Sequence, residues 1–196
     1  SIEKLKKVTE PRPGEEIFGM TMITLKGKTI LVADTNVQDF PSPQRLVKVS
    51  KSCVRVARLF GFDPKVAFLS HSTFGKPISK NTKHVRDAIE ILKKENVDFD
   101  FDGEMQPDVA LNPIYQEIYP FSKIVGNANI LIMPALHSAA ISTKLMKVFG
   151  GGKLIGPLLI GLGSPIEVAP LRASTSEILN LASIAAYSSD VIDYSN

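Results

Sequence analysis

The stretch Lys65-Val-Ala-Phe-Leu69, followed directly by Ser70-His-Ser-Thr-Phe-Gly-Lys-Pro77, decides the fold class. Its first part is a short apolar run, which is typical of a strand covered on both faces, as in the parallel sheets of α/β proteins. Its second part is polar and contains a glycine, which predicts a loop at the carboxyl end of that strand. In open α/β sheets, ligands bind beyond the carboxyl ends of the strands.

Further apolar runs predict the rest of a mostly parallel sheet. The other expected central strands are residues 29–33, 128–133 and 154–160. Residues 98–102 alternate with period two, which favours a place nearer an edge. Residues 21–25 and 29–32 flank Lys26-Gly27-Lys28, which indicates a hairpin.

Helical periods lie between these strands. Residues 44–60 carry an apolar stripe, with Ser42 and Pro43 as start signals and Gly61 as a stop. The other expected helices span residues 81–95, 108–118, 138–149 and 176–191. In the first of these, we expect Val85, Ala88, Ile89 and Leu92 to face inward. Alternation of strands and helices predicts right-handed crossovers, and therefore a three-layer α/β sandwich.

Composition excludes several classes of protein. The 196 residues carry a net charge of +3 without basic clusters, so we expect neither nucleic acid nor membrane as a partner. No apolar run reaches the length of a membrane span, and the single cysteine fits a reducing compartment. We therefore expect a cytoplasmic protein, a linker or tail over residues 1–16, and a chain that begins inside a longer one.

Two loops are candidates for chemistry. The first offers Ser70, Ser72, Thr73 and Gly75 as phosphate donors, although a polar loop with helix caps explains it equally well. The second, Asp102-Gly-Glu-Met-Gln-Pro-Asp108, holds three carboxylates, of which Asp108 suits a helix start better than an acid/base pair.

Other motifs favour structural roles. The three histidines are widely separated, and no spacing of ligands predicts a metal site. Gly150-Gly-Gly152 is typical of a helix end, and Gly161-Leu-Gly163 lacks the rest of a dinucleotide fingerprint. Cys53 lies on an apolar stripe, and Ser174-Thr-Ser-Glu177 fits a capping box.

Read together, five blocks of sequence resemble the phosphotransacetylases and phosphotransbutyrylases. They follow the order and spacing of that family over nearly residues 20 to 190. The blocks are Ala33-Asp-Thr-Asn-Val37, Val66-Ala-Phe-Leu-Ser-His-Ser-Thr-Phe-Gly75, Phe101-Asp-Gly-Glu-Met-Gln-Pro-Asp108, Gly126-Asn-Ala-Asn-Ile-Leu-Ile-Met-Pro134 and Gly156-Pro-Leu-Leu-Ile-Gly-Leu-Gly-Ser-Pro165. The resemblance implies two α/β domains with a cleft between them, here the second domain (17–164) plus a C-terminal piece of the first (165–196).

One departure from the family pattern concerns catalysis. The family carries a Ser-Arg pair and, six positions after the arginine, an acidic residue. This sequence offers Pro170, Leu171 and Glu177 there, or Arg172 if the match slips by one residue. Neither Pro170 nor Leu171 donates a side-chain hydrogen bond, and losing one such donor costs about 3–4 kcal/mol in a transition state. We therefore expect no transferase activity.

The sequences of residues 70–75 and 102–108 resemble the C-terminal domain of bacterial hybrid malic enzymes more closely than they resemble the active transferases. That resemblance implies a regulatory domain that binds acetyl-CoA or a related acyl-CoA and forms a homodimer, with a higher oligomer in the full-length protein. NADP and a divalent metal are then expected only in other domains, with no metal here. The ligand-binding residues expected on this basis are Ser70, Ser72, Thr73, Gly75, Asp102, Pro134 and Arg172. An active phosphate acetyl/butyryltransferase and a structural dimerisation module without ligand are the alternatives.

Overall fold

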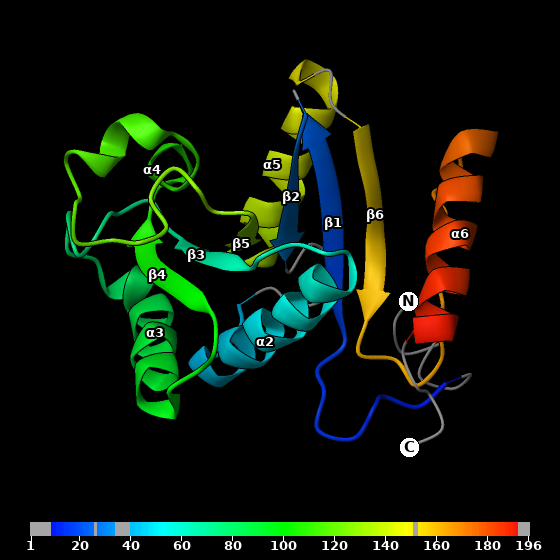
Figure 1. Cartoon of the computed structure of the whole chain (residues 1–196), viewed down its shortest axis with the longest axis horizontal. Helices are drawn as coiled ribbons and strands as arrows, with labels where there is room; N and C mark the ends of the chain where they lie inside the picture. The colour runs from blue at the N-terminus through cyan, green and yellow to red at the C-terminus, as the bar shows by residue number, and fades with distance from the viewer. Residues whose placement is uncertain (1–8, 26, 34–39, 151–152, 192–196) are drawn as a thin grey trace.

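The computed structural model describes residues 9–25, 27–33, 40–150 and 153–191, which form one mixed sheet flanked by helices (Figure 1). The strands are β1 (Phe18–Leu25), β2 (Lys28–Ala33), β3 (Lys65–Leu69), β4 (Asp100–Met105), β5 (Ile130–Ile132) and β6 (Lys153–Ile160). The α-helices are α2 (Pro43–Leu59), α3 (Lys83–Glu95), α4 (Pro107–Leu111), α5 (Leu136–Phe149) and α6 (Thr175–Val191). The family-like block at 33–37 lies, apart from Ala33, outside these residues.

The six strands lie in the order β4-β3-β5-β2-β1-β6. Strands β4, β3, β5 and β2 are parallel neighbours, whereas β1 is antiparallel to both β2 and β6. The predicted strand at 65–69, the hairpin of β1 and β2, and the edge position of β4 are confirmed. The central position predicted for residues 154–160 is wrong, because β6 is an edge strand paired only with β1 among the named strands.

Helices cover both faces of the sheet, which confirms the three-layer α/β sandwich. One core cluster joins α2 and α3 to the sheet and includes Leu181 of α6. The second cluster lies on the opposite face, where Val109 and Ala110 of α4 and Ala139 of α5 pack. In Figure 1, α6 stands beside β6, at the end of the sheet farthest from β4.

Local signals explain the ends of the helices. Ser42 caps α2, because its Oγ accepts a hydrogen bond from the Arg45 backbone N at 3.2 Å. Gly61, with φ of 77°, follows the last turn in the left-handed region. The four apolar residues of α3 that were expected to face inward are buried, namely Val85, Ala88, Ile89 and Leu92.

The predicted helix over residues 108–118 is wrong in length. The α-helix α4 ends at Leu111, and a short 3-10 turn follows over Pro113–Gln116. Pro113 has no backbone N–H and its ring clashes with the preceding turn, so a continuous helix cannot cross this position. Apolar spacing alone does not reveal such a break.

The segment before β1 is fastened to the end of β6. The Arg12 backbone N donates to the Gly161 carbonyl at 3.0 Å, and the Gly163 backbone N donates to the Glu10 carbonyl at 2.8 Å. Glu16 forms an ion pair with Arg45 on α2 at 2.6 Å. Residues 9–16, expected as part of a linker, therefore contact the sheet and α2, while the division at residues 16 and 164 stays a prediction.

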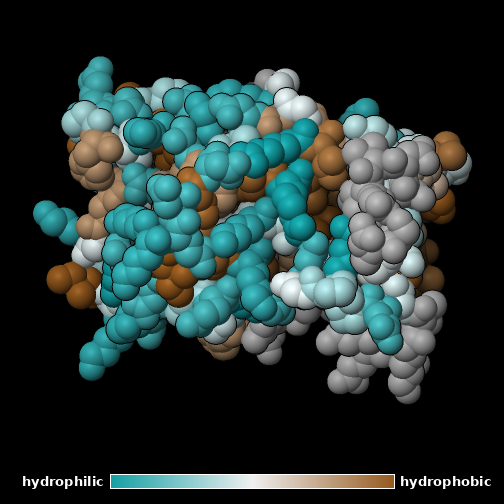
Figure 2. All heavy atoms as spheres, turned by 60° about the horizontal axis from the view of Figure 1, so that its bottom comes forward, coloured by the Kyte–Doolittle hydropathy of each residue, from teal (hydrophilic) through white to brown (hydrophobic). Residues whose placement is uncertain are grey.

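The surface over α2 and α3 is largely hydrophilic, with hydrophobic side chains in separate patches (Figure 2). Ion pairs such as Lys51–Glu95 and Arg58–Asp98 lie on this side. Across the part of the chain that the structure describes, no helix is long and apolar enough to cross a membrane.

Candidate functional site

A hollow of about 840 Å³ lies beyond the carboxyl ends of β3 and β5, where the first turns of α3 and α5 meet. We call it the strand-end hollow. It is lined by Phe40, Pro41, Leu69, Ser70, His71, Asn81, Thr82, His84, Pro107, Met133, Pro134, Ala135, His137, Ser138 and Ser142. The parallel topology creates it, because the polar loops that follow β3 and β5 leave the sheet on the same side.

A buried carboxylate holds the loop after β3 in place. The Glu104 residue is 1% exposed, and its Oε1 accepts from Ser72 Oγ at 2.7 Å and from the Gly75 backbone N at 3.2 Å. Arg86 on α3 supplies the counter-charge, with Nη1 3.1 Å from the same oxygen. Buried charges need such a partner and hydrogen bonds to offset their desolvation. We call this group the Glu104 cluster; it ties together β4, α3 and the loop at 70–75.

Gly103 makes this placement of Glu104 possible. Its φ of 145° lies in a region that favours glycine, and an added Cβ would stand 2.6 Å from the Phe68 carbonyl oxygen on β3. Any larger residue would therefore push β4 away from β3. The sequence-based interpretation named Glu104 among three nearby carboxylates but missed its burial, which period-two alternation does not reveal.

The Glu104 cluster uses two of the four groups in this loop that were expected to bind phosphate. Ser72 and Gly75 donate to Glu104, and Thr73 Oγ1 accepts from the Gln106 backbone N at 3.2 Å. Asp102 Oδ1 accepts from the neighbouring Gly103 backbone N at 2.8 Å. Of the seven expected ligand-binding residues, only two line the strand-end hollow, and these are Ser70 and Pro134.

All three histidines of the chain line the same hollow, although they are far apart in sequence. His71 follows β3, His84 lies in the first turn of α3, and His137 lies in the first turn of α5. The His84 Nε2 atom lies 3.0 Å from the Pro134 carbonyl oxygen, and the His137 ring lies 5.6 Å from the ring of Phe40. Sequence spacing suited to metal sites missed this convergence; the signal available was that each histidine stands at a strand or helix end.

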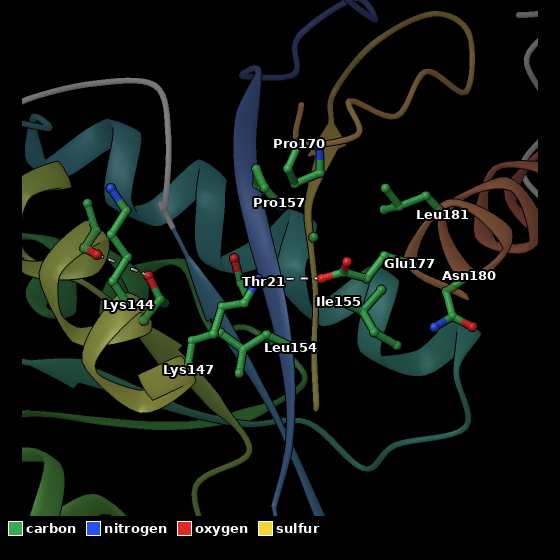
Figure 3. A pocket seen from close by; sticks show the side chains of 13 residues that line it. Thr21, Lys144, Lys147, Leu154, Ile155, Pro157, Pro170, Glu177, Asn180 and Leu181 are labelled. Carbon is green, nitrogen blue, oxygen red and sulfur yellow. Dashed lines mark hydrogen bonds and ion pairs between the residues drawn. The ribbon is translucent and has the colours of Figure 1, made fainter. Parts of the chain in front are cut away.

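A second hollow separates α5 from α6 and runs along β6 (Figure 3). We call it the α5–α6 groove. Figure 3 shows Lys147 of α5 reaching toward Glu177 of α6, with Pro157 and Pro170 farther along β6. The Lys147 Nζ lies 3.4 Å from Glu177 Oε1. Pro170 lines the groove without any hydrogen to donate, and Leu171 is fully exposed and does not line it.

Glu177 is used as a helix cap. Its Oε2 accepts from the Ser174 backbone N at 2.8 Å and from Ser174 Oγ at 2.9 Å, while its own backbone N donates to Ser174 Oγ at 3.2 Å. This reciprocal pattern confirms the predicted capping box. The hydrogen bond from the Ser174 backbone lowers the pKa of Glu177, and the Ser174 hydroxyl and Lys147 lower it further.

Arg172 lies away from the strand-end hollow. Its side chain is exposed and lines neither that hollow nor the α5–α6 groove. It follows the segment that returns along β6, and three strands separate β6 from β3 in the sheet. Neighbouring strands are about 4.8 Å apart, which puts Ser70 and this end of the sheet on the order of 20 Å apart. The structure therefore does not bring Arg172 to Ser70, Ser72 and Thr73.

A third hollow, of about 330 Å³, lies between α2, β6 and α6 and contains a half-buried acid. Glu167 belongs to the segment that returns along β6, and its Oε2 accepts from the Leu159 backbone N at 3.3 Å. Burial raises the pKa of Glu167 to about 8, although the hydrogen bond from Leu159 acts in the opposite direction. The protonated form of this carboxyl is therefore favoured more than in an exposed glutamate.

Comparisons with known proteins agree on one family. The profile of the family described as "Phosphate acetyl/butaryl transferase" matches residues 1–186. The chain is 43% identical over 187 residues to the NADP-dependent malic enzyme of Rhizobium meliloti, covering 95% of this chain and 25% of that protein. It is 33% identical over 155 residues to the phosphate acetyltransferase of Bacillus subtilis, covering 79% of this chain and 48% of that protein.

Solved structures confirm the fold. A phosphotransacetylase from Streptococcus pyogenes superimposes with a TM-score of 0.88 at 30% identity, covering 95% of this chain and 58% of that one. The chain thus spans a quarter of the length of the malic enzyme and about half of the length of the transferases.

Proposed function

Because the chain belongs to the phosphate acetyl/butyryl transferase family, we propose that it is a regulatory acetyl-CoA-binding and oligomerisation domain without transferase activity. The full-length protein to which this domain belongs is an NADP-dependent malic enzyme. The similarity to such enzymes from Rhizobium meliloti and Escherichia coli supports this part of the proposal. The oxidation of malate then belongs to parts of that protein outside this chain.

The observation that carries the loss of activity is the state of the α5–α6 groove. Of the residues that stand where the family has its Ser-Arg pair, Pro170 lines the groove without a donor and Leu171 faces solvent. The acid at the third position, Glu177, is committed to capping α6 and to Lys147. Each missing donor to a developing oxyanion costs about 3–4 kcal/mol, or a factor of several hundred in rate.

Binding of an acyl-CoA is supported by the strand-end hollow. Its volume of about 840 Å³ falls within the range of small-molecule sites, roughly 300–1,000 Å³. The described residues that line it include no carboxylate, so nothing among them repels an anionic ligand. The Glu104 cluster holds the loop of Ser70 in place from the core side. Binding therefore does not have to include the entropy cost of ordering that loop.

The test is a pair of measurements on the full-length enzyme and on this chain. Calorimetric titration with acetyl-CoA should show saturable binding, and a thiol-release assay with CoA and acetyl phosphate should stay at background. Turnover that a groove variant such as Glu177→Ala abolishes would contradict the proposal and establish the active transferase. Absence of both binding and turnover would leave the chain a structural module.

The oligomerisation role rests on the outer face of α5. Ile141, Leu145, Val148 and Phe149 recur at helical spacing and are 59%, 52%, 76% and 82% exposed. Four large apolar side chains in one stripe form a patch of the kind that marks protein interfaces. A second copy of the chain is the occupant we propose, because the isologous pairing of one helix stripe with itself gives a closed dimer.

Sedimentation tests this pairing. The wild-type chain should be a dimer at tens of micromolar, and Leu145→Glu should shift it to a monomer, because a buried interface does not tolerate an unpaired charge. Lys144→Glu, which lies on α5 outside the stripe, serves as the control and should remain dimeric. A monomeric wild-type chain would contradict the role.

A further inference from the structure

The hollow between α2, β6 and α6 is separate from the strand-end hollow and from the α5–α6 groove, and we call it the Glu167 hollow. Among the described residues, none that lines it also lines either of the other two. Its volume of about 330 Å³ lies at the lower end of the range for small-molecule sites, roughly 300–1,000 Å³. Apolar side chains form much of its wall, among them Val56, Leu59, Phe60, Leu158, Leu162 and Ile184. The hollow therefore suits a small ligand with an apolar body.

The arginines that line this hollow are paired with acids of the protein. Arg55 on α2 forms an ion pair with Glu15 at 2.8 Å, and Arg12 lies 3.9 Å from the same acid. Arg58, also on α2, pairs with Asp98 at 3.0 Å. Because each arginine faces an acid, the three attract an anionic ligand less than unpaired arginines would.

Glu167 is the charged residue of the lining that lacks a counter-charge. Its Oε2 accepts one hydrogen bond, from the Leu159 backbone N at 3.3 Å, and no cationic side chain among the described residues forms an ion pair with it. One such bond leaves most of the acceptor capacity of a carboxylate unused. Burial raises the pKa of Glu167 to about 8, since a charge removed from water needs a partner. The hollow thus lacks one positive charge.

Two aromatic rings form part of the same wall. Phe60, at the end of α2, and Tyr187, on α6, stack with their centroids 6.0 Å apart and their planes at 23°, and both line the hollow. The Tyr187 hydroxyl donates to the Leu59 carbonyl oxygen at 3.1 Å, which fixes this ring against α2. Aromatic rings pack well against an apolar ligand and attract cations through their π faces. They add to the preference for a ligand that is apolar and positively charged.

We propose that the Glu167 hollow binds a small organic amine, whose ammonium group pairs with the Glu167 carboxylate while its apolar body packs against Val56, Leu158 and Ile184. The ligand supplies the missing positive charge, and the apolar walls exclude water, which strengthens a charge-assisted hydrogen bond. An anionic ligand would instead meet an acid that has no counter-charge. The amine site is independent of the proposed acetyl-CoA site, because the two hollows share no described residue.

Three probes that share one phenylethyl skeleton separate the effect of charge from that of shape. They are 2-phenylethylamine, 2-phenylethanol and 3-phenylpropionate, which end in an ammonium, a hydroxyl and a carboxylate. Binding to the full-length protein is measured by saturation-transfer NMR at pH 8.5, which lies above the pKa of Glu167 and below that of an alkylammonium, about 10. The amine should bind saturably, and the alcohol should bind at least about tenfold more weakly, because it lacks the charge-assisted hydrogen bond. The carboxylate should bind least.

A conservative variant assigns the charge to one residue. Glu167→Gln keeps the size of the side chain and an acceptor for the Leu159 N–H but removes the charge. It should bind the amine at least about tenfold more weakly than wild type does, while its affinity for the alcohol changes less than twofold. Glu117→Gln, which removes an exposed acid outside the hollow, is the matched control and should leave both affinities unchanged. Thermal unfolding at the same pH checks that both variants are folded.

Four results would overturn the inference. They are the absence of saturable amine binding by wild type, equal binding of amine and alcohol, tighter binding of the carboxylate than of the amine, and an unchanged amine affinity in Glu167→Gln. A parallel loss of amine and alcohol binding in Glu167→Gln would likewise overturn it, because it would show that Glu167 only shapes the hollow. None of these results bears on acetyl-CoA binding, which is measured separately.

Discussion

The two hollows on either side of α5 differ in how their polar groups are supported. Around the strand-end hollow, parallel strands end together, and a fully buried Glu104 holds the loop of Ser70 through hydrogen bonds from Ser72 and Gly75 and accepts a third from Arg86 on α3. Along the α5–α6 groove, the sheet is antiparallel, and the polar groups of Glu177 lie exposed at a helix start. The first is a rigid site built into the core, whereas the second is a surface groove.

This difference separates the ability to bind from the ability to catalyse. Binding requires only that donors and shape persist, and the Glu104 cluster preserves the shape without taking part in chemistry. Catalysis requires donors at one developing charge, and in the proposed function Pro170 and Leu171 stand where such donors would be needed. A chain can therefore lose turnover and keep its ligand, because the two properties depend on different parts of the molecule.

The largest expected effect is on the Glu104 cluster. Glu104→Ala leaves Arg86 without its acid and frees Ser72 and the Gly75 N–H, so we expect a loss of about 2–4 kcal/mol of unfolding free energy. Urea denaturation measures it, and affinity for acetyl-CoA should fall as the loop of Ser70 loosens. Asp87→Ala, which breaks an exposed pair on α3, is the control and should cost less than about 1 kcal/mol. Equal losses in the two variants would show that the cluster is no firmer than a surface pair.

Glu167, in the hollow between α2, β6 and α6, should make the free energy of unfolding depend on pH. Its pKa of about 8 in the folded chain lies above its ordinary value, so folding disfavours the ionised form. That penalty is absent below the ordinary pKa of glutamate, grows as pH rises, and is complete above about pH 8. Glu167→Gln keeps an acceptor for Leu159 and should be more stable than wild type by on the order of 2 kcal/mol at pH 9, but not at pH 5. A stability difference that does not change with pH would contradict this assignment.

Replacing Glu177 should change the stability of the fold by less than replacing Glu104 or Glu167. Glu177→Ala removes the side-chain half of the capping box, so α6 should fray and the Tm should fall by a few degrees at most. The pKa of Glu177 is lowered in the fold, so its contribution is present at neutral pH and is lost as acid protonates the carboxylate. Thermal unfolding at pH 7 and at acidic pH measures both effects. Binding of acetyl-CoA should be unchanged, and a large loss of binding would place the ligand in the groove instead.

Arg172 should have the smallest effect. The sequence places Arg172 among the expected ligand-binding residues, which by itself predicts that Arg172→Ala weakens acetyl-CoA binding about tenfold. Because Arg172 is exposed and lines neither hollow, we now expect affinity and Tm to stay within error of wild type. A tenfold loss in calorimetric titration would show that the ligand extends across the sheet to the end of β6.

The sequence predicted where most helices and strands lie along the chain, but it predicted less well which strands are neighbours in the sheet. The bounds of β3 and the inward face of α3 could be predicted from the spacing of apolar residues, because which side of an element is buried shows in its own sequence. The position of β6 in the sheet could not be predicted in this way, because an apolar run indicates that a strand is buried but not which strands lie beside it. The break at Pro113 was visible in the sequence but was outweighed by apolar periodicity.

The candidate site was predicted only in part for a related reason. Ser70 and Pro134 stand at strand ends, which topology alone places at the hollow. Whether Ser72 and Gly75 face a ligand or the protein depends on Glu104, about 30 residues away, and the hydroxyl of Thr73 meets Gln106 in the same way. The convergence of the three histidines likewise depends on the packing of α3 and α5 against the sheet, which sequence spacing does not encode.

The segment that returns along β6 also limits how copies of the chain can join. Its bridge between Glu167 and Leu158 lies on the outer side of β6 and pairs part of that edge. At the opposite edge, β4 carries Asp100 and Asp102, whose negative charges would oppose the same edge of a second chain. Both edges of the sheet are therefore poorly suited to adding a strand from a second chain.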